Sequence, residues 1–253
     1  SFTSIGDTAS FVGTVKDASG NTIPGRTVAW ATSSSSITTV SSSGLVTSVA
    51  DGTVTITATS GLVSTTASVS VAQTAASITL APTSLSFTSI DDTASFVATV
   101  KDANDNTMSG ATVTWATSTA SVATVSSAGL VTGRAVGSAT ITATSGSVNQ
   151  TATATVSQAA ASVTLAPTSL SFASFGDTTT LVPTVKDAND NTMGGATVTW
   201  ATSSSSIATV SSAGLVTGLA VGSATITATF GSVSKTATVS VAQTAASITL
   251  APT

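Results

Sequence analysis

The sequence predicts an all-β protein built from three tandem β-sandwich domains in an elongated array. Three observations predict it: an 85-residue repeat, short segments in which apolar and hydroxyl residues alternate, and a composition rich in β-branched residues. Hydrophobic residues make up 41% of the 253 residues, whereas charged residues make up 6% and aromatic residues 4%. This composition favours folded sheet over disorder, because disordered chains are usually poor in hydrophobic residues.

The repeat keeps its 85-residue step without an insertion or deletion. It is marked by three recurring residues: Trp30, Trp115 and Trp200; Lys16, Lys101 and Lys186; Phe2, Phe87 and Phe172. A period of this length fits a small independent domain better than one coil of a solenoid. The expected units are a domain lacking its first strand at 1–74, complete domains at 75–159 and 160–244, and the first strand of a further domain at 245–253.

The middle repeat gives the expected order of strands. "SITLAP" is the first, and "TASFVATVKD" is the second. The turn "DANDN" follows, because Asp and Asn bond their own backbone and tolerate left-handed conformations. The remaining strands are "ATVTWATS", "SVATVSS", "GLVTGRA", "SATITATS" and "QTATATVS". About seven short strands, about 8–12 residues apart and without helical periodicity, predict a β-sandwich. In the third repeat Pro183 falls inside the second strand, which predicts that this strand is bulged or locally unpaired there.

The segment "TVKDANDNTMSGATVTWATSTASVATVSSAGLVTGRAVGSATITATSG" resembles the bacterial group 2 immunoglobulin-like (Ig-like) domain family. The matching features are the V-K-D-A-N-x-N turn, one Trp per repeat, and the runs S-V-A-T-V-S-x-x-G-L-V-T-G and V-G-S-A-T-I-T-A-T. The resemblance covers essentially the whole chain in three copies. It implies tandem extracellular modules of bacterial surface proteins, among them invasin- and intimin-like adhesins, and also of some phage structural proteins. It implies no catalytic residues.

Composition argues against several classes of function. The chain has no Cys, His, Tyr or Glu, so a Ser-His-Asp or Cys-His constellation cannot be built, and neither an enzyme nor a cofactor is expected. Six Lys and Arg residues and a net charge of −4 leave no basic patch for nucleic acid. An apolar run long enough to insert into a membrane is also missing from the sequence.

Two kinds of candidate site remain. Clustered oxygen ligands in the "DANDN" turns are weak candidates for Ca²⁺, and the alternative is an ordinary turn joining two strands: Asp102, Asn104, Asp105, Asp187, Asn189 and Asp190. The Trp of each repeat could stack on a sugar, but it alternates in phase with an apolar residue on a predicted inner strand. We therefore expect Trp30, Trp115 and Trp200 to belong to the domain cores.

The chain starts at the "SF" of one repeat and stops two residues before the next "SF" would begin. Two interpretations stay open: a head-to-tail polymer in which the last strand completes the first domain of the next molecule, or a window on a longer covalent array. The expected donor residues are Ser247, Ile248, Thr249, Leu250 and Pro252, and the expected acceptor residues are Phe2, Phe11, Val69 and Val71. The predicted partner is thus another copy or a neighbouring domain of the same chain.

The function expected from these observations is structural: an extracellular or cell-surface filament, stalk or adhesin shaft made of Ig-like modules. The alternative is an adhesion module that binds carbohydrate or a host or cell partner, or a phage structural protein. The seam "VSVAQTAASITL" contains neither Gly nor Pro, which predicts short and fairly stiff connections between the domains.

Overall fold

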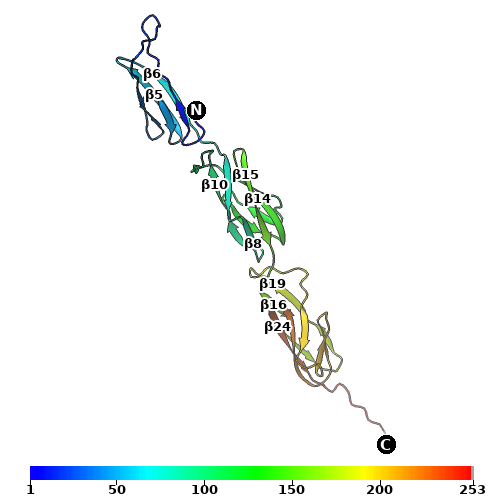
Figure 1. The fold of residues 1–253 in the computed structure, drawn as a ribbon. Helices are drawn as coiled ribbons and strands as arrows, with labels where there is room; N and C mark the ends of the chain where they lie inside the picture. Colours follow the sequence, from blue (N-terminus) through cyan, green and yellow to red (C-terminus); the bar gives the residue numbers. More distant parts are fainter. Residues whose placement is uncertain (252–253) are drawn as a thin grey trace.

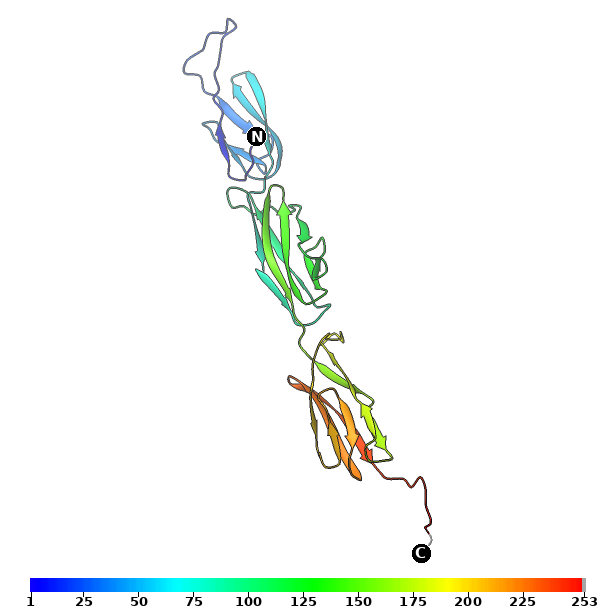
Figure 2. The same ribbon diagram turned by 90° about the vertical axis from the view of Figure 1, so that its right-hand side faces the viewer.

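The computed structural model describes residues 1–251 as three β-domains placed end to end (Figure 1). Figure 2, turned by 90°, shows the same narrow rod, so the molecule is elongated in both views. The described residues form 24 strands. Within residues 1–251 there is no helix long and apolar enough to cross a membrane. The prediction of an all-β tandem array is therefore confirmed.

The middle domain has nine strands: β7 (Ser77–Ala81), β8 (Ser84–Phe87), β9 (Thr93–Ser95), β10 (Val97–Lys101), β11 (Thr114–Thr117), β12 (Ala123–Val125), β13 (Leu130–Gly133), β14 (Gly137–Ser145) and β15 (Val148–Val156). They form a four-stranded sheet, β11-β14-β15-β8, opposite the sheets β12-β13-β9 and β10-β7. Strand β8, which the sequence analysis did not predict, runs parallel to β15.

Alternation in the long strands builds the core between these layers. In β14 the side chains of Ala139, Ile141 and Ala143 are buried, whereas intervening Thr residues face outward. The expected second strand is divided at Phe96, where the chain passes from the sheet that pairs β9 with β13 to the one that pairs β10 with β7. The Phe96 ring, 1% exposed, fills the centre of the domain at this crossing point.

The third domain repeats this plan in β16 (Ser162–Ala166), β17 (Ser169–Phe172), β18 (Thr178–Thr180), β19 (Val182–Lys186), β20 (Thr199–Thr202), β21 (Ala208–Val210), β22 (Leu215–Gly218), β23 (Gly222–Phe230) and β24 (Val233–Val241). The prediction of a bulge or of a local loss of pairing at Pro183 is wrong, since Pro183 pairs with Leu165 in an uninterrupted ladder. Proline is tolerated because β19 pairs only with β16 in a two-stranded sheet, which leaves its other edge free of ladder bonds.

The first domain has only six strands: β1 (Thr8–Ser10), β2 (Ala29–Thr32), β3 (Thr38–Val40), β4 (Leu45–Ser48), β5 (Gly52–Ser60) and β6 (Val63–Val71). It has no counterpart of β7, and residues 12–15, which correspond to most of β10, form no strand. Its core cluster in the described residues has six buried members, compared with 14 in the middle domain and 15 in the third. The first domain thus has fewer strands and a smaller core cluster than the other two within residues 1–251.

Candidate functional site

The first feature of functional interest is the joint between neighbouring domains. The "DANDN" turn of the middle domain, at residues 102–106, lies against the loop of residues 4–7 in the first domain. The Asp102 Oδ2 atom accepts hydrogen bonds from the Ile5 backbone N–H at 2.9 Å and from Gln73 Nε2 at 2.8 Å. Asp102 Oδ1 accepts from the backbone N–H groups of the turn itself. One carboxylate thus links a turn, the preceding domain and the connecting segment.

Two Asn side chains complete this joint. Asn104 Nδ2 donates to the Ile5 carbonyl oxygen at 2.9 Å and to Asp7 Oδ1 at 3.0 Å, and Asn106 Nδ2 donates to the same carbonyl at 2.8 Å. The Ile5 peptide group is therefore held by both its N–H and its C=O. Such a pattern fixes orientation, because hydrogen bonds to a charged group are strong and directional.

The second joint has the same contacts as the first, between residues whose numbers are 85 higher. Asp187 Oδ2 accepts from the Ile90 N–H and from Gln158 Nε2, both at 3.0 Å. Asn189 and Asn191 donate to the Ile90 carbonyl oxygen at 2.8 and 3.0 Å. Two independent copies of one contact indicate that the sequence specifies the relative placement of successive domains.

The electrostatics of the joints follow from this geometry. Asp102 and Asp187 are each only 2% exposed. Burial by itself would raise the pKa of Asp102, but the hydrogen bonds from Gln73 and from backbone N–H groups outweigh it and lower the pKa to about 2. The pKa of Asp187 is lowered against the same effect of burial by the equivalent donors. Both carboxylates are therefore held in their charged form.

These contacts bear on the six calcium candidates. Each oxygen of Asp102 and of Asp187 already accepts hydrogen bonds, and the amides of Asn104 and Asn189 are turned toward the preceding domain. Asp105 and Asp190 lie outside the joints, 3.7 and 3.6 Å from Lys ammonium groups. Residues 1–251 hold no group of three or more acidic residues placed to bind a metal ion. Calcium binding stays a hypothesis that this geometry does not favour.

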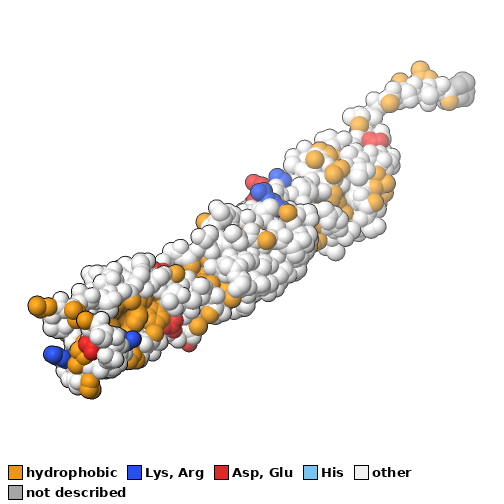
Figure 3. Space-filling model, turned by 90° about the horizontal axis from the view of Figure 1, so that it is seen from above, with side chains coloured by type: hydrophobic (Ala, Val, Ile, Leu, Met, Phe, Trp, Pro, Cys, Tyr) orange, Lys and Arg blue, Asp and Glu red, His pale blue; other side chains and the backbone are white. Residues whose placement is uncertain are grey.

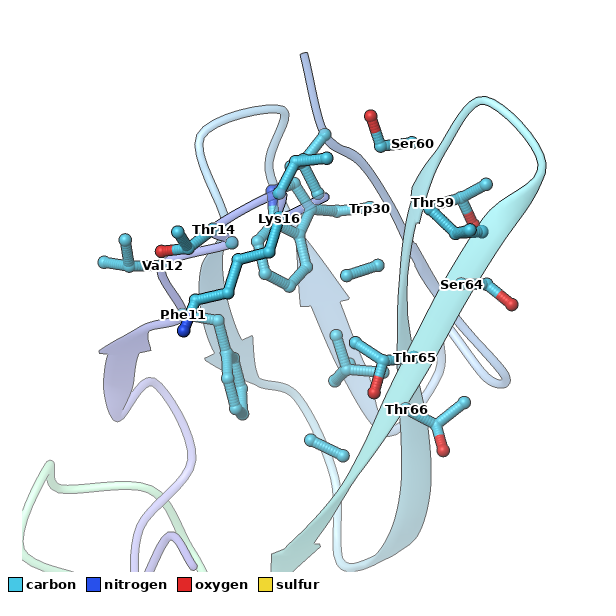
Figure 4. Close-up of a pocket in the computed structure, with 17 residues that line it drawn as sticks. Phe11, Val12, Thr14, Lys16, Trp30, Thr59, Ser60, Ser64, Thr65 and Thr66 are labelled. Carbon is cyan, nitrogen blue, oxygen red and sulfur yellow. The ribbon is translucent and has the colours of Figure 1, made fainter. Parts of the chain in front are cut away.

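The second feature is an open groove in the first domain. It has a volume of about 360 Å³ and runs between residues 11–16 and the hairpin of β5 and β6 (Figure 4). Phe11, Val15, Trp30 and Ile56 give it an apolar floor. In the middle domain the corresponding space lies between β10 and β15, and it is filled by β7 with Ile78 and Leu80 buried. Figure 3 shows exposed hydrophobic side chains on the first domain, at the end of the molecule opposite the extended C-terminal segment.

The structure divides the predicted acceptor residues. Phe11 lines the groove, whereas Phe2, Val69 and Val71 do not. Phe2, Val69 and Val71 are buried in the core of the first domain. Phe2 also forms a parallel bridge to Val71. Five further groove residues, none predicted as an acceptor, could have been found from the repeat. They lie 85 positions before the residues that pair with β7: Val12, Gly13, Thr14, Val15 and Lys16.

The predicted donor residues lie in an extended segment after β24. Ile248 and Leu250 are 91% and 95% exposed and belong to no strand. Ser247 and Thr249 are exposed as well. Pro252 lies outside the described residues. The isolated chain thus has an apolar strand sequence at one end of the rod and an unfilled groove in the domain at the other end (Figures 1 and 4).

The three Trp residues are partly buried and pack against their domain cores. Trp115 lies beside Phe96 with ring centroids 6.5 Å apart, and Trp30 beside Phe11 at 6.1 Å. These rings cover apolar side chains, which leaves less of their surface for a sugar. In the first domain Trp30 also lines the groove.

The fold and the joints define a class of protein: tandem Ig-like β-sandwiches in which each domain contacts the next through a repeated set of hydrogen bonds within the chain. The family model of the bacterial Ig-like domain (group 2) matches residues 4–71, 74–156 and 159–241. The chain belongs to this family.

Similarity to individual proteins is more limited. The chain is 35% identical over 138 residues to Ice-binding protein 1 of Shewanella frigidimarina (strain NCIMB 400), covering 52% of this chain and 15% of that protein. It is similar in structure to the integrin-binding bacterial protein invasin, at 19% identity and a TM-score of 0.44 over 90% of this chain and 55% of that one. The Escherichia coli adhesin FdeC gives 19% identity and a TM-score of 0.41 over 94% and 93%. The chain thus spans a small part of its curated relative.

Proposed function

We propose that this chain is a structural segment of an extracellular bacterial shaft or stalk, in which successive Ig-like domains are held in one orientation. The observation that carries the proposal is the repetition of the joint: Asp102 and Asp187 make the same hydrogen bonds to the preceding domain. A flexible tether between domains does not require a buried carboxylate at each joint. Burying a carboxylate is costly unless its bonds are satisfied, so these contacts favour a stiff rod.

We further propose that the open groove of the first domain accepts residues 247–251 of another copy by β-strand addition. Residues 239–253 repeat the sequence of residues 69–83, so the donor has the same letters as the segment that forms β7. The register follows from the pairing of β7 with β10: Leu250 would lie opposite Gly13, and Ile248 opposite Val15. Docking would bury both apolar side chains, as Ile78 and Leu80 are buried at 7% and 8% exposure.

Strand addition should contribute a large favourable free energy. Full burial of two large aliphatic side chains contributes about 3–6 kcal/mol before the cost of association is subtracted. The unpaired edge of residues 12–16 would gain a ladder of backbone hydrogen bonds, which removes an exposed strand edge. Because donor and acceptor lie at opposite ends of the rod, the association is head to tail and open-ended.

Electron microscopy and sedimentation of the full chain test this proposal. We expect association that increases with concentration and filaments whose axial repeat spans three domains. The substitution Ile248→Asp should abolish association, because it places a charge in the groove. Thr249→Asp is the matched control, since its counterpart Thr79 in β7 is exposed. Monomers at every concentration, or equal loss with both substitutions, would contradict strand addition.

A further inference from the structure

We infer that the middle and third domains each contain a mechanical clamp, a pair of parallel strands that carries tension along the shaft by resisting shear. In the middle domain the clamp consists of β8 and β15 with the residues that directly follow each strand, and in the third domain of β17 and β24 with theirs. The inference rests on the proposed shaft function, because a shaft between two bodies is loaded along its length. It assigns that load to particular strands inside each domain.

The strands of the clamp run from one joint of the middle domain to the other. Ser77, at the start of β7, pairs with Lys101 beside the first joint, and β7 leads directly into β8. Strand β8 ends shortly before Ile90, whose peptide group is held in the second joint. Strand β15 runs parallel to β8 and ends where the chain leaves for the third domain (Figure 1). Tension between the joints therefore pulls β8 and β15 in opposite directions along their own axes.

The ladder between the two strands is loaded as a whole by such a pull. Four residue pairs join β8 to β15, and the hydrogen bonds of a parallel ladder are evenly spaced. The pairing continues beyond β15, because the Ser157 N–H donates to the Phe87 carbonyl oxygen at 2.9 Å. The Ala159 N–H donates in the same way to the Thr88 carbonyl oxygen at 2.8 Å. A shear force is shared among these bonds, whereas a force that separates the strands from one end breaks them one after another.

The side chains beneath the ladder are closely packed as well. Leu85 and Phe87 of β8 and Val156 of β15 are buried in the domain core. The backbone of Gly133 in β13 lies directly against two of them, since a Cβ there would be 3.0 Å from Val156 Cγ2 and 3.3 Å from Phe87 Cδ2. Sliding β8 past β15 would therefore break backbone hydrogen bonds and expose apolar surface in the same step.

The third domain has the same arrangement between β17 and β24, which also run parallel. The Ala242 N–H donates to the Phe172 carbonyl oxygen at 2.9 Å, and the Thr244 N–H donates to the Ala173 carbonyl oxygen at 3.1 Å. Gly218 is equally close to the pair, because a Cβ there would be 2.8 Å from Phe172 Cδ2. Two successive domains thus oppose tension along the rod with the same strand pair.

The pairing of the sheet indicates which strand yields first. Strand β15 lies between β14 and β8, and it pairs with β14 along its whole length from Val148 to Val156. Strand β8 is at the edge of this sheet and pairs with β15 alone. At the barrier to forced unfolding, β8 is therefore detached while the hairpin of β14 and β15 is still intact.

Single-molecule force spectroscopy of the full chain tests the shear geometry. The chain has no Cys, so two introduced thiols determine where the force acts. Handles at Ser84→Cys and Ser157→Cys pull β8 and β15 along their axes, whereas handles at Ser84→Cys and Thr153→Cys pull one residue pair directly apart. All three side chains are exposed, so both chains should unfold at the same temperature in calorimetry. We expect a several-fold higher unfolding force with the first handles at the same pulling rate, and equal forces would overturn the clamp.

A matched pair of substitutions tests which contacts break at the barrier. Phe87→Leu alters β8, and Phe96→Leu makes the same change at a buried position outside the clamp. Both should lower the calorimetric unfolding temperature of the middle domain. Under constant force along the rod, Phe87→Leu should shorten the lifetime of this domain about fivefold or more and Phe96→Leu should not, because only contacts already lost at the barrier change the unfolding rate.

The third domain of the same molecule is the internal control, and its lifetime should be the same in both variants. Equal shortening by the two substitutions, shortening by Phe96→Leu alone, or no change with Phe87→Leu would overturn the inference. Its failure is distinguishable from failure of the proposed function, because the force acts within one domain of one molecule. Chains that stay monomeric in sedimentation overturn strand addition and leave the clamp standing, whereas equal forces in the two pulling directions overturn the clamp and leave the joints between domains intact.

Discussion

The carboxylate of Asp102 and the backbone N–H of Ile5 lie 2.9 Å apart, although 97 residues separate them and they belong to different domains. The equivalent pair in the second joint, Asp187 and Ile90, is 3.0 Å apart. A hydrogen bond to a buried charge is one of the stronger polar contacts in a protein. These pairs link each domain to the one that follows it.

The first prediction concerns the Asp102 joint. The substitution Asp102→Asn replaces the Oδ2 acceptor by a donor, which leaves the Ile5 N–H buried without a partner and costs about 2 kcal/mol. Amide exchange of Ile5, followed by NMR, should become about 30-fold faster. The Ile90 amide in the second joint is an internal control and should keep its rate. If the Ile5 amide exchanged at the same rate in the unsubstituted protein and in the Asp102→Asn variant, the joint would not hold the domains together.

The second prediction concerns pH. The folded-state pKa of Asp102 is about 2, below its ordinary value of 3.8, so its ionised form stabilises the joint. The contribution is complete above about pH 4 and is lost as pH falls toward 2, because the carboxyl of the opened joint, with its ordinary pKa, binds a proton at a higher pH than the carboxyl of the closed joint does. Asp187 shifts in the same direction. Small-angle X-ray scattering should show a constant maximum dimension from pH 7 to 5 and a more flexible particle near pH 2.

The third prediction concerns the glycine beside the Trp of the middle domain. Gly129 has a φ of 79°, and a Cβ there would lie 2.5 Å from the Phe96 carbonyl oxygen and 2.9 Å from Trp115 Cζ2. Gly129→Ala should therefore destabilise the domain by about 3 kcal/mol or more. Gly146→Ala is the matched control, since Gly146 has a φ of 57° and open space around it, and should cost about 1 kcal/mol. Calorimetric unfolding of both variants measures the difference.

Much of the fold could be predicted from the sequence, because the 85-residue register and the alternation of apolar and hydroxyl residues are local signals. The division at Phe96 could not, since nothing in "TASFVATVKD" shows that the chain changes sheets there. Strand β8 was missed because "SLSF" is short and pairs with residues far away in sequence. Pro183 was misread because the sequence does not show which strands lie at a sheet edge.

The candidate site was predicted less completely. The turns of residues 102–106 and 187–191 were noticed for their oxygen ligands, but their contacts with Ile5 and Ile90 depend on how whole domains meet. Gln73 and Gln158 gave no signal in sequence beyond their recurrence at the seam. The donor role of residues 247–251 stays a prediction, and of the four predicted acceptor residues Phe11 lines the groove whereas Phe2, Val69 and Val71 are buried in the core.

Hydrogen–deuterium exchange of residues 12–16 in the full chain tests the central claim most directly, because residues 97–101 and 182–186 of the same molecule are its paired counterparts. At low concentration the amides of residues 12–16 should exchange far faster than those two segments. With rising chain concentration, or with the added peptide of residues 244–253, they should become protected while the other two segments stay unchanged. Rapid exchange of residues 12–16 at every concentration and with the peptide in excess would contradict the account.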